Sequence, residues 1–186
     1  LRPIALVTGA GSGIGRAVAT AFLKSNYGVV LVGRRAHALE DTIELASADE
    51  ALAFPVVCDV SKAADVDALF EQTRDRFHRL DVLFNNAGIN IASKSLDEIT
   101  IEEWDSVVGV NLTGSFLCAR AAFSLMKNQD PMGGRIINNG SVSARAPRPG
   151  RTARSRAVGG LRRVQRHADP AAAARRAGRL RRRRRP

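Results

Sequence analysis

Residues 8–15 read Thr-Gly-Ala-Gly-Ser-Gly-Ile-Gly, and they connect an apolar run at 4–8 to a segment with the apolar spacing of a helix. Glycine has no Cβ, so Gly9 and Gly13 permit a tight turn and let the backbone approach an anion closely. The helix that follows presents its unpaired first N–H groups and the positive end of its dipole to that anion. Gly15 lets this helix pack closely against the strand. The stretch predicts a turn that binds the diphosphate of a nucleotide.

Outside the glycine stretch, short apolar runs alternate with segments of helical periodicity. The apolar runs, which we expect to form strands, cover residues 4–8, 28–32, 54–57, 82–84 and 135–138. The segments with helical spacing cover residues 15–25, 36–48, 65–77, 100–111 and 112–127. Helices of this length between strands imply right-handed crossovers and therefore a parallel sheet. The predicted fold is α/β, a Rossmann-type doubly wound parallel sheet that is truncated after about the fifth strand.

Four further motifs follow the glycine stretch along the chain. They are Cys-Asp-Val at 58–60, Asn-Asn-Ala-Gly at 85–88, Val-Asn-Leu at 110–112 and Gly-Ser at 140–141. Together with the spacing Thr-Gly-x-x-x-Gly-x-Gly, these motifs make residues 4–150 resemble the short-chain dehydrogenases/reductases. The resemblance implies an oxidoreductase that transfers a hydride between NADP(H), or NAD(H), and a carbonyl/alcohol substrate.

Most of the matching residues are assigned to the cofactor by this resemblance. Asp59 resembles the acceptor for the adenine amino group, and the alternative is a residue that only forms a turn. The segment 86–88 resembles the small residues beside the adenine ribose, and a plain turn of Asn and Gly is its alternative. The residues expected at the cofactor are Gly9, Ser12, Gly13, Ile14, Gly15, Arg34, Asp59, Val60, Asn86, Ala87 and Gly88.

The end of the second expected strand favours one form of the cofactor. Residues 33–35 are Gly-Arg-Arg and include no acid. Enzymes that use NAD place an acid there, where it accepts hydrogen bonds from both ribose hydroxyls. An acid would repel a 2′-phosphate, whereas Arg34 can pair with it through two parallel hydrogen bonds. NADP(H) is therefore favoured, with NAD as the second choice. The alternative is that both arginines only begin a solvated helix.

Two residues are expected to take part in catalysis by resemblance. Asn111 resembles the family's helix-distorting asparagine, which binds a water molecule of the proton relay. An asparagine in mid-helix is otherwise only a weak helix former. Ser141 resembles the serine that hydrogen-bonds the substrate carbonyl or hydroxyl, and the alternative is a polar residue at a strand end.

The family's remaining catalytic pair, a Tyr and a Lys, would fall where this chain has Arg154 and Val158. In the family the Tyr is the general acid/base, and the Lys lowers the pKa of that Tyr. The chain has a single tyrosine, Tyr27, which lies far from these positions in the sequence, and no lysine follows Lys127. The alternative function is therefore a catalytically dead fragment that binds the nucleotide without turnover.

Positive charge is concentrated in residues 151–186. This segment holds 14 of the 29 basic residues and one of the 18 acidic residues, so residues 1–150 carry a net charge of −2 while the whole chain carries +11. We expect an incomplete NAD(P)-binding Rossmann domain at 1–150 and an Arg-rich disordered tail at 151–186, because adjacent like charges repel. The Arg-rich composition of residues 151–186 has two explanations, a frameshift near codon 150 or a genuine basic tail. Nucleic-acid binding by the tail is a third function, which its lack of aromatic residues disfavours.

The remaining sequence features predict the state of the cysteines, the partners and the location of the protein. Cys58 and Cys118 lie in apolar runs without metal-ligand spacing, so we expect buried free thiols and no metal. No run approaches the roughly 20 apolar residues that cross a bilayer, so no membrane partner is expected. The expected partners are a small-molecule carbonyl/alcohol substrate and, for an intact relative, further copies in a homodimer or tetramer, with no specific nucleic acid. The expected location is cytoplasmic.

Overall fold

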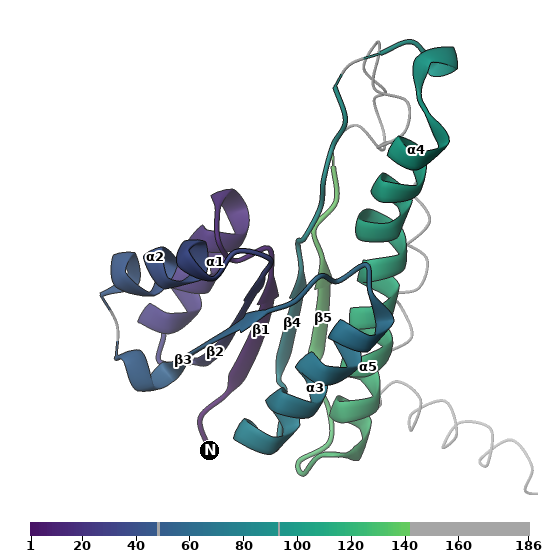
Figure 1. Ribbon diagram of the computed structural model, residues 1–186. Coiled ribbons are helices and arrows are strands. Elements are labelled where there is room, and N and C mark those ends of the chain that lie inside the picture. The colour runs from purple at the N-terminus through teal and green to yellow at the C-terminus, as the bar shows by residue number, and fades with distance from the viewer. Residues whose placement is uncertain (48, 93, 142–186) are drawn as a thin grey trace, which may run out of the picture.

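The computed structural model describes residues 1–47, 49–92 and 94–141. These ranges contain a five-stranded parallel sheet with helices on both faces (Figure 1). The tail expected at 151–186, which includes Arg154 and Val158, lies outside the described residues. The boundary expected at residue 150 lies outside them as well, so the division into two parts stays a prediction.

Five strands form the sheet, and each is parallel to its neighbours. They are β1 (Ile4–Thr8), β2 (Gly28–Gly33), β3 (Ala53–Val57), β4 (Val82–Asn85) and β5 (Arg135–Asn138). The order across the sheet is β3-β2-β1-β4-β5. The chain therefore builds outward from β1 to β3 and then returns to the other side of β1 for β4 and β5. The order of the strands reverses between β1 and β4.

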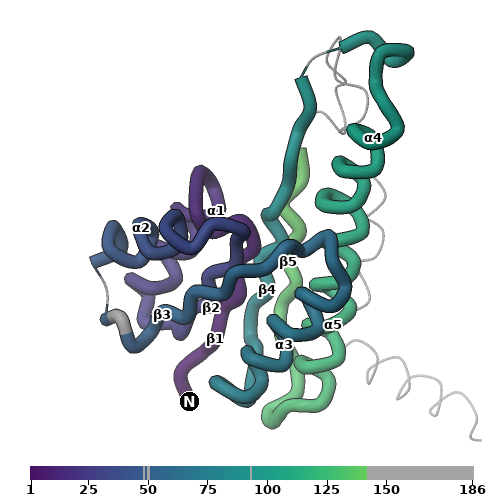
Figure 2. The backbone as a smooth tube through the Cα atoms, in the orientation of Figure 1, coloured from purple at the N-terminus to yellow at the C-terminus, as the bar shows by residue number. Residues whose placement is uncertain are grey.

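Helices cover both faces of the sheet, as Figures 1 and 2 show. Helices α1 (Gly13–Lys24) and α2 (Ala36–Ala46) lie on one face. On the other face lie α3 (Ala63–Phe77) and a long segment made of α4 (Ile101–Val108), the π-helical turn η3 (Gly109–Gly114) and α5 (Ser115–Asn128). Two short 3₁₀ helices, η1 (Glu50–Leu52) and η2 (Leu96–Glu98), lie in the connections.

The core has two halves because side chains alternate between the faces of a strand. On β1, Leu6 belongs to the apolar cluster that includes residues of α3 and α5. Its neighbour Val7 belongs to the cluster that includes residues of α1 and α2. Both faces of β1 are therefore covered, and all five of its residues are buried. This burial explains why β1 reads as a continuous apolar run and not as an alternating one.

The predicted doubly wound parallel sheet is confirmed, and every expected strand and helix is present, with ends that match the prediction or lie within a few residues of it. The main difference lies at 100–127, where the two expected helices join through the π-helical turn Gly109–Gly114. Asn111 lies in this turn, so the helix distortion expected from the resemblance is present. The two 3₁₀ helices were not predicted, because three-residue segments carry too little periodicity to be recognised.

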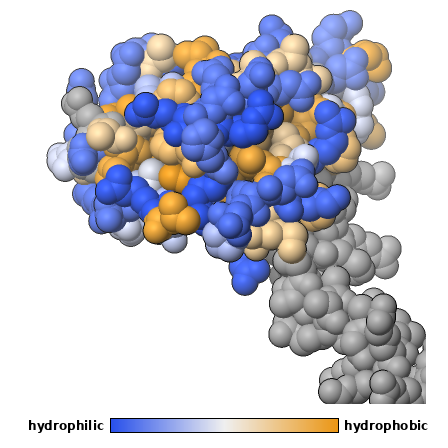
Figure 3. All heavy atoms as spheres, turned by 90° about the horizontal axis from the view of Figure 1, so that it is seen from below, coloured by the Kyte–Doolittle hydropathy of each residue, from blue (hydrophilic) through white to orange (hydrophobic). Residues whose placement is uncertain are grey.

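The segment Ile101–Asn128 is long and apolar enough, by length and composition, to cross a membrane. The sequence pattern did not predict it, because charged residues such as Arg120 interrupt the apolar runs. Here Cys118, Ala122 and Met126 of this segment are buried against the sheet. A core helix of a soluble protein meets the same two criteria. The face shown in Figure 3 mixes hydrophilic and hydrophobic residues.

A leucine pair tests this arrangement of the core. Leu31 on β2 is fully buried beneath α1 and α2. The substitution Leu31→Ala leaves a cavity, so we expect the free energy of unfolding to fall by about 2–5 kcal/mol. The control is Leu45→Ala, which truncates a side chain that is 60% exposed on α2 and should change this energy by less than about 0.5 kcal/mol. Urea denaturation measures both changes, and equal losses would contradict the packing described.

Candidate functional site

The glycine stretch joins β1 to α1 through backbone conformations that glycine adopts most easily. Gly9 has a φ of +68° and Gly13 a φ of +53°, both in the left-handed region. Ser12 precedes α1, and its side chain makes no capping hydrogen bond. No acidic residue lies in the first turn of α1. The positive end of the α1 dipole is therefore not neutralised by the chain itself, which is the condition for binding an anion there.

Gly15 is the point at which α1 comes closest to the strands. A Cβ built on Gly15 would lie 2.1 Å from the Gly9 carbonyl oxygen and 2.6 Å from Asn86 Nδ2. Both distances are below the 3.0 Å that real Cβ atoms respect. The close helix–strand packing expected at Gly15 is therefore present, and no other residue fits there without moving the backbone.

Thr8, the last residue of β1, joins the glycine turn to the end of β4. Its Oγ1 accepts hydrogen bonds from the backbone N–H groups of Asn86 and Ala87, each at 2.9 Å. In return, Asn86 Nδ2 donates a hydrogen bond to the Thr8 carbonyl oxygen at 3.1 Å. These bonds hold the 85–88 motif against the glycine turn, at the place where the strand order reverses. Open α/β sheets bind their ligands at this switch point.

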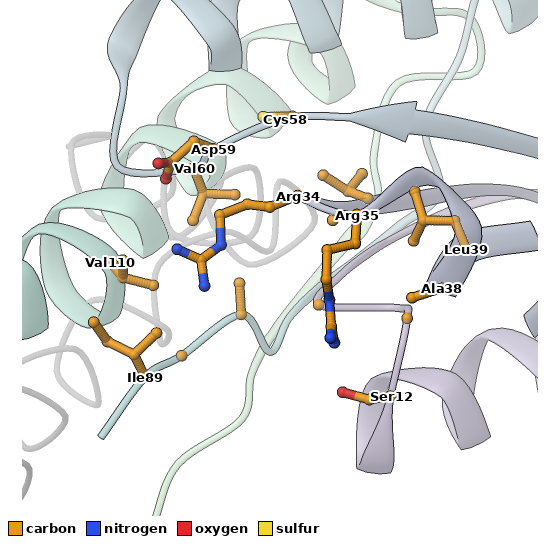
Figure 4. A pocket seen from close by; sticks show the side chains of 16 residues that line it. Ser12, Arg34, Arg35, Ala38, Leu39, Cys58, Asp59, Val60, Ile89 and Val110 are labelled. Atoms are coloured by element: carbon orange, nitrogen blue, oxygen red, sulfur yellow. The ribbon is translucent and has the colours of Figure 1, made fainter. Parts of the chain in front are cut away.

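A cavity opens at this carboxyl-terminal edge of the sheet (Figure 4). Its wall combines the glycine turn, the end of β2 with the start of α2, the segments after β3 and β4, and one residue of η3. Seven of the residues expected at the cofactor line it, namely Gly9, Ser12, Arg34, Asp59, Val60, Ala87 and Gly88. Motifs that are widely separated in the sequence therefore meet around one cavity.

The other four residues expected at the cofactor, Gly13, Ile14, Gly15 and Asn86, do not line the cavity. Gly15 and Asn86 support its wall through the contacts described above, and the Ile14 side chain is 60% exposed. The residues that sequence reasoning missed are Gly11, Val32, Gly33, Arg35, Ala38, Leu39, Cys58, Ile89 and Val110. Gly11, Cys58 and Val110 belong to the motifs described above, and Gly33 and Arg35 to the segment 33–35, but none of them was assigned to the cofactor. The other four, Val32, Ala38, Leu39 and Ile89, are uncharged, and their only signal was their closeness in sequence to these segments.

Arg34 and Arg35 give the cavity its positive charge. Both are exposed and lie between β2 and α2. Figure 4 shows the Arg34 side chain extending into the space beside Val60, and the Arg35 side chain extending toward Ser12. Among the lining residues, Asp59 is the single acid. A phosphate group at this opening would therefore meet a predominantly positive surface.

Asp59 is oriented by the turn that follows β3. Its Oδ1 accepts hydrogen bonds from Ser61 Oγ at 2.8 Å and from the Ser61 N–H at 3.1 Å. The Ser61 hydroxyl bond lowers the pKa of Asp59 most, partial burial opposes this effect, and nearby Arg34 and Lys62 lower the pKa further. Asp65 Oδ2 accepts the Asp59 N–H at 3.0 Å and fixes the backbone. The carboxyl group is therefore ionised at neutral pH and serves as an acceptor in the wall.

Asn111 uses its side chain to hold the segment that follows β4. Its Oδ1 accepts the Ile89 N–H at 2.8 Å, and its Nδ2 donates to the Ile89 carbonyl oxygen at 2.9 Å. A Cβ on Gly88 would lie 3.2 Å from this Oδ1, so the packing is close here as well. Asn111 is buried and does not line the cavity. Its role in a proton relay stays a prediction.

Ser141 is the last described residue, and it does not line the cavity. Two asparagine pairs fasten the segment before it to the end of β4. Asn85 Nδ2 donates to Asn138 Oδ1 at 2.9 Å, and Asn139 Nδ2 donates to Asn86 Oδ1 at 2.9 Å. The structure therefore places Asn138 and Asn139, which precede Ser141, beside the 85–88 motif. The contact of Ser141 with a substrate stays a prediction.

The two cysteines are buried free thiols, as the sequence predicts. Burial raises the pKa of each thiol to about 12, and the nearby carboxylates of Asp65 and Asp59 contribute at Cys58. Neither thiol is therefore ionised at neutral pH. Within the ranges that the structure describes, no group of three or more His, Cys, Asp and Glu side chains is placed to hold a metal ion.

The arrangement agrees with a known protein family. The family model described as short chain dehydrogenase matches residues 3–169 of this sequence. The chain belongs to the short-chain dehydrogenase family. Its members are oxidoreductases that combine the Rossmann fold with NAD(P) binding. The match extends past residue 150, where the resemblance in the motifs ends.

Several short-chain dehydrogenases resemble this chain along most of its length. A 3-oxoacyl-[acyl-carrier-protein] reductase from Synechocystis sp. is 40% identical over 161 residues, which cover 85% of this chain and 63% of that protein. Glucose 1-dehydrogenase 2 from Bacillus subtilis is 36% identical over 159 residues, which cover 84% of this chain and 61% of that protein. This chain therefore spans about three fifths of the length of these curated relatives.

The fold also matches solved structures, at a sequence identity similar to that of the two relatives. The crystal structure of 3-ketoacyl-(acyl-carrier-protein) reductase from Brucella melitensis, complexed with NADH, superposes with a TM-score of 0.81 at 35% sequence identity. The superposition covers 87% of this chain and 66% of that one. It confirms the Rossmann-type sheet of this short-chain dehydrogenase.

Two glycine substitutions test the geometry of the turn. Gly15→Ala places a Cβ against backbone atoms, so we expect the free energy of unfolding to fall by about 3 kcal/mol or more. Gly13→Ala meets no atom within 4 Å and is strained only by its positive φ, so its loss should be about 1–2 kcal/mol. Urea denaturation without nucleotide measures both losses. A smaller loss for Gly15→Ala than for Gly13→Ala would contradict the close approach described.

Proposed function

We propose that this short-chain dehydrogenase binds NADP(H) in the cavity at the switch point of its sheet. The observation that carries the proposal is the composition of the cavity wall. On one side is a glycine turn that leads into a helix without an acid in its first turn, and on another side are Arg34 and Arg35. The turn would hold the diphosphate, Asp59 the adenine and Arg34 the 2′-phosphate. When bound, the nicotinamide supplies the hydride chemistry.

The shape of the turn fits such a group. No heavy atom lies within 4 Å of a Cβ built on Gly13, so the outer side of the turn is open. At Gly9 the opposite holds, because a Cβ there would lie 3.0 Å from Asn86 Nδ2 and 3.1 Å from Ala87 Cα. The backbone is thus packed against the segment after β4 on one side and accessible on the other, as a turn that receives a diphosphate requires.

The preference for NADP(H) over NAD(H) is proposed from charge. Neither position between β2 and α2 carries an acid that would accept bonds from two ribose hydroxyls, and both carry an arginine. An arginine pairs well with a phosphate dianion but gains little from neutral hydroxyls. The solved Brucella melitensis reductase contains NADH, which keeps NAD(H) as the second choice.

The reaction proposed for this fold is hydride transfer between the nicotinamide and a carbonyl/alcohol substrate. Ser141 would hydrogen-bond the substrate oxygen, and Asn111 would support a water molecule of the proton relay. The two named relatives are a 3-oxoacyl-[acyl-carrier-protein] reductase and a glucose dehydrogenase. Because a 3-oxoacyl group on an acyl-carrier protein and glucose differ in size and polarity, the proposal names only the carbonyl/alcohol class of small molecules.

A second candidate function, nucleotide binding without turnover, is favoured by one observation. Arg154 and Val158 stand where the family has its catalytic Tyr and Lys. A guanidinium does not give up its proton near neutral pH, and a valine side chain has none to transfer. Neither residue can therefore replace a tyrosine as the general acid/base.

The domain organisation, the location and the oligomeric state are proposed from the sequence. Residues 1–150 would form the NAD(P)-binding domain, and residues 151–186 an Arg-rich tail without a nucleic-acid function. The location would be cytoplasmic, and an intact relative would form a homodimer or tetramer.

Binding of the two cofactors tests the nucleotide proposal. For the full chain we expect a lower dissociation constant for NADPH than for NADH in calorimetric titrations. Arg34→Ala removes a charge-assisted contact, so the affinity for NADPH should fall by about 10-fold or more while that for NADH changes little. The matched control is Arg2→Ala, an exposed arginine outside the cavity, which should alter neither affinity. Absence of binding by the full chain at millimolar NADPH and NADH would refute the proposal.

Turnover separates the two candidate functions. With saturating NADPH and a panel of aldehydes and ketones, we expect the full chain to bind the cofactor and to consume it no faster than a buffer control. The reason is the missing phenol at the hydride-transfer site. Cofactor consumption that depends on both the carbonyl and the protein would refute the non-catalytic alternative and would favour the oxidoreductase.

A further inference from the structure

Arg16, in the first turn of α1, directs its guanidinium group back onto the glycine turn. Its Nη2 donates a hydrogen bond to the Gly11 carbonyl oxygen at 2.6 Å, and its Nε donates to Thr42 Oγ1 at 3.1 Å. Hydrogen bonds from a charged donor are shorter and about twice as strong as neutral ones. Gly11 lines the cavity, whereas Arg16 does not. Arg16 therefore contacts the glycine turn from outside the cavity.

Thr42 connects this contact to α2. Thr42 is fully buried, and its Oγ1 lies 2.9 Å from the Ala38 carbonyl oxygen and 3.0 Å from the Ala10 carbonyl oxygen. A hydroxyl has one proton and two lone pairs. Because Arg16 donates to a lone pair of Oγ1, the hydroxyl proton is left for one of these two carbonyl groups. The result is one hydrogen-bonded network of α1, the glycine turn and α2.

Packing supports the same arrangement. A Cβ built on Gly11 would lie 3.0 Å from Ala38 Cβ and 3.3 Å from the Ala38 carbonyl oxygen. The turn therefore rests directly on α2, which provides a fixed support beneath it. Without Arg16, α2 would act on the turn only through van der Waals contact and, when the Thr42 hydroxyl proton points to it, through the hydrogen bond to the Ala10 carbonyl oxygen.

The bond to Gly11 determines which way the peptide between Gly11 and Ser12 faces. In a planar trans peptide the carbonyl and the following N–H point in opposite directions. Holding the Gly11 oxygen on Arg16 therefore directs the Ser12 N–H away from Arg16. Glycine rotates more freely than other residues. A rotated peptide would present its carbonyl oxygen, instead of its N–H, to an anion in the cavity.

We propose that Arg16 is a positioning residue, whose hydrogen bond to the Gly11 carbonyl sets the glycine turn for a nucleotide diphosphate before the nucleotide binds. The inference rests on the proposed NADP(H) binding and extends it to a residue outside the cavity. Preorganisation of this kind raises affinity because the turn does not have to be ordered when the ligand arrives.

The neighbouring ion pair provides a matched control. Arg16 Nη2 also lies 3.7 Å from Asp41 Oδ2, and the two side chains are 31% and 56% exposed. An exposed pair at this distance contributes little, because water and salt screen it. Asp41→Asn therefore removes the ion pair and leaves the bonds of Arg16 to Gly11 and Thr42 in place.

Calorimetric titration of the full chain with three ligands tests the proposal. NADPH and ADP-ribose carry the diphosphate, whereas 2′-AMP carries adenine, ribose and the 2′-phosphate only. Arg16→Met removes all donors from a side chain of similar length. We expect the affinities for NADPH and ADP-ribose to fall about 10- to 100-fold, and that for 2′-AMP to change less than about 3-fold. Arg16→Lys keeps one donor and should recover part of the loss, while Asp41→Asn should change none of the three affinities.

The outcomes separate this inference from the proposed function. If the parent chain binds NADPH and Arg16→Met binds it equally well, the inference is overturned. An equal loss for 2′-AMP would overturn it too, because a general loosening of the cavity would then be the cause. If the parent binds no dinucleotide, the proposed function fails and the inference fails with it. If Arg16→Met shows no cooperative urea transition, it is not folded, and Arg16→Lys takes its place in the comparison with the parent. Equal affinity of the parent and Arg16→Lys for NADPH, or an equal loss for 2′-AMP, would then overturn the inference.

Discussion

The close approach of α1 to the ends of β1 and β4 is the steric constraint on which the site depends. No Cβ fits at Gly15, because the Gly9 carbonyl and the Asn86 amide already occupy that space. The start of α1 thereby lies next to Ser12, which lines the cavity, while the pairing of β1 with β4 brings Asn86 and Ala87 into hydrogen bonds with Thr8. A side chain at Gly15 would push the helix outward and separate the glycine turn from the 85–88 motif.

Charge in the site follows from local placement and not from the composition of the chain. Residues 1–150 carry a small net negative charge, yet the cavity is positive because its charged residues are Arg34, Arg35 and a single acid. That acid, Asp59, is held ionised by the Ser61 hydroxyl. The isoelectric point near 11.2 reflects the arginines of 151–186 and carries no information about the cavity.

Several residues serve the site from outside its surface. Asn111 holds the Ile89 backbone, Asn139 holds the Asn86 side chain, and Arg16 holds the Gly11 carbonyl. Each uses a side-chain amide or guanidinium group to fix a backbone or amide group near the cavity. Positioning of this kind matters because a site displaced by about 1 Å loses much of its binding or catalytic strength. The positions of the cavity residues therefore depend on these three side chains, which do not themselves line the cavity.

The sequence by itself determined the parallel α/β architecture and the place of the glycine turn, because both follow from local patterns. Strand burial appears as apolar runs, and the turn requires glycine at particular positions whatever the rest of the chain does. It also indicated Arg34, since a charge directly after β2 must lie at the edge of the sheet. What only the tertiary structure decided were contacts between distant residues, such as Thr8 with Asn86, Asn111 with Ile89 and Thr42 with Arg16. Such pairs leave no mark on local periodicity, because hydrogen-bond partners across elements are chosen by the packing of the complete fold.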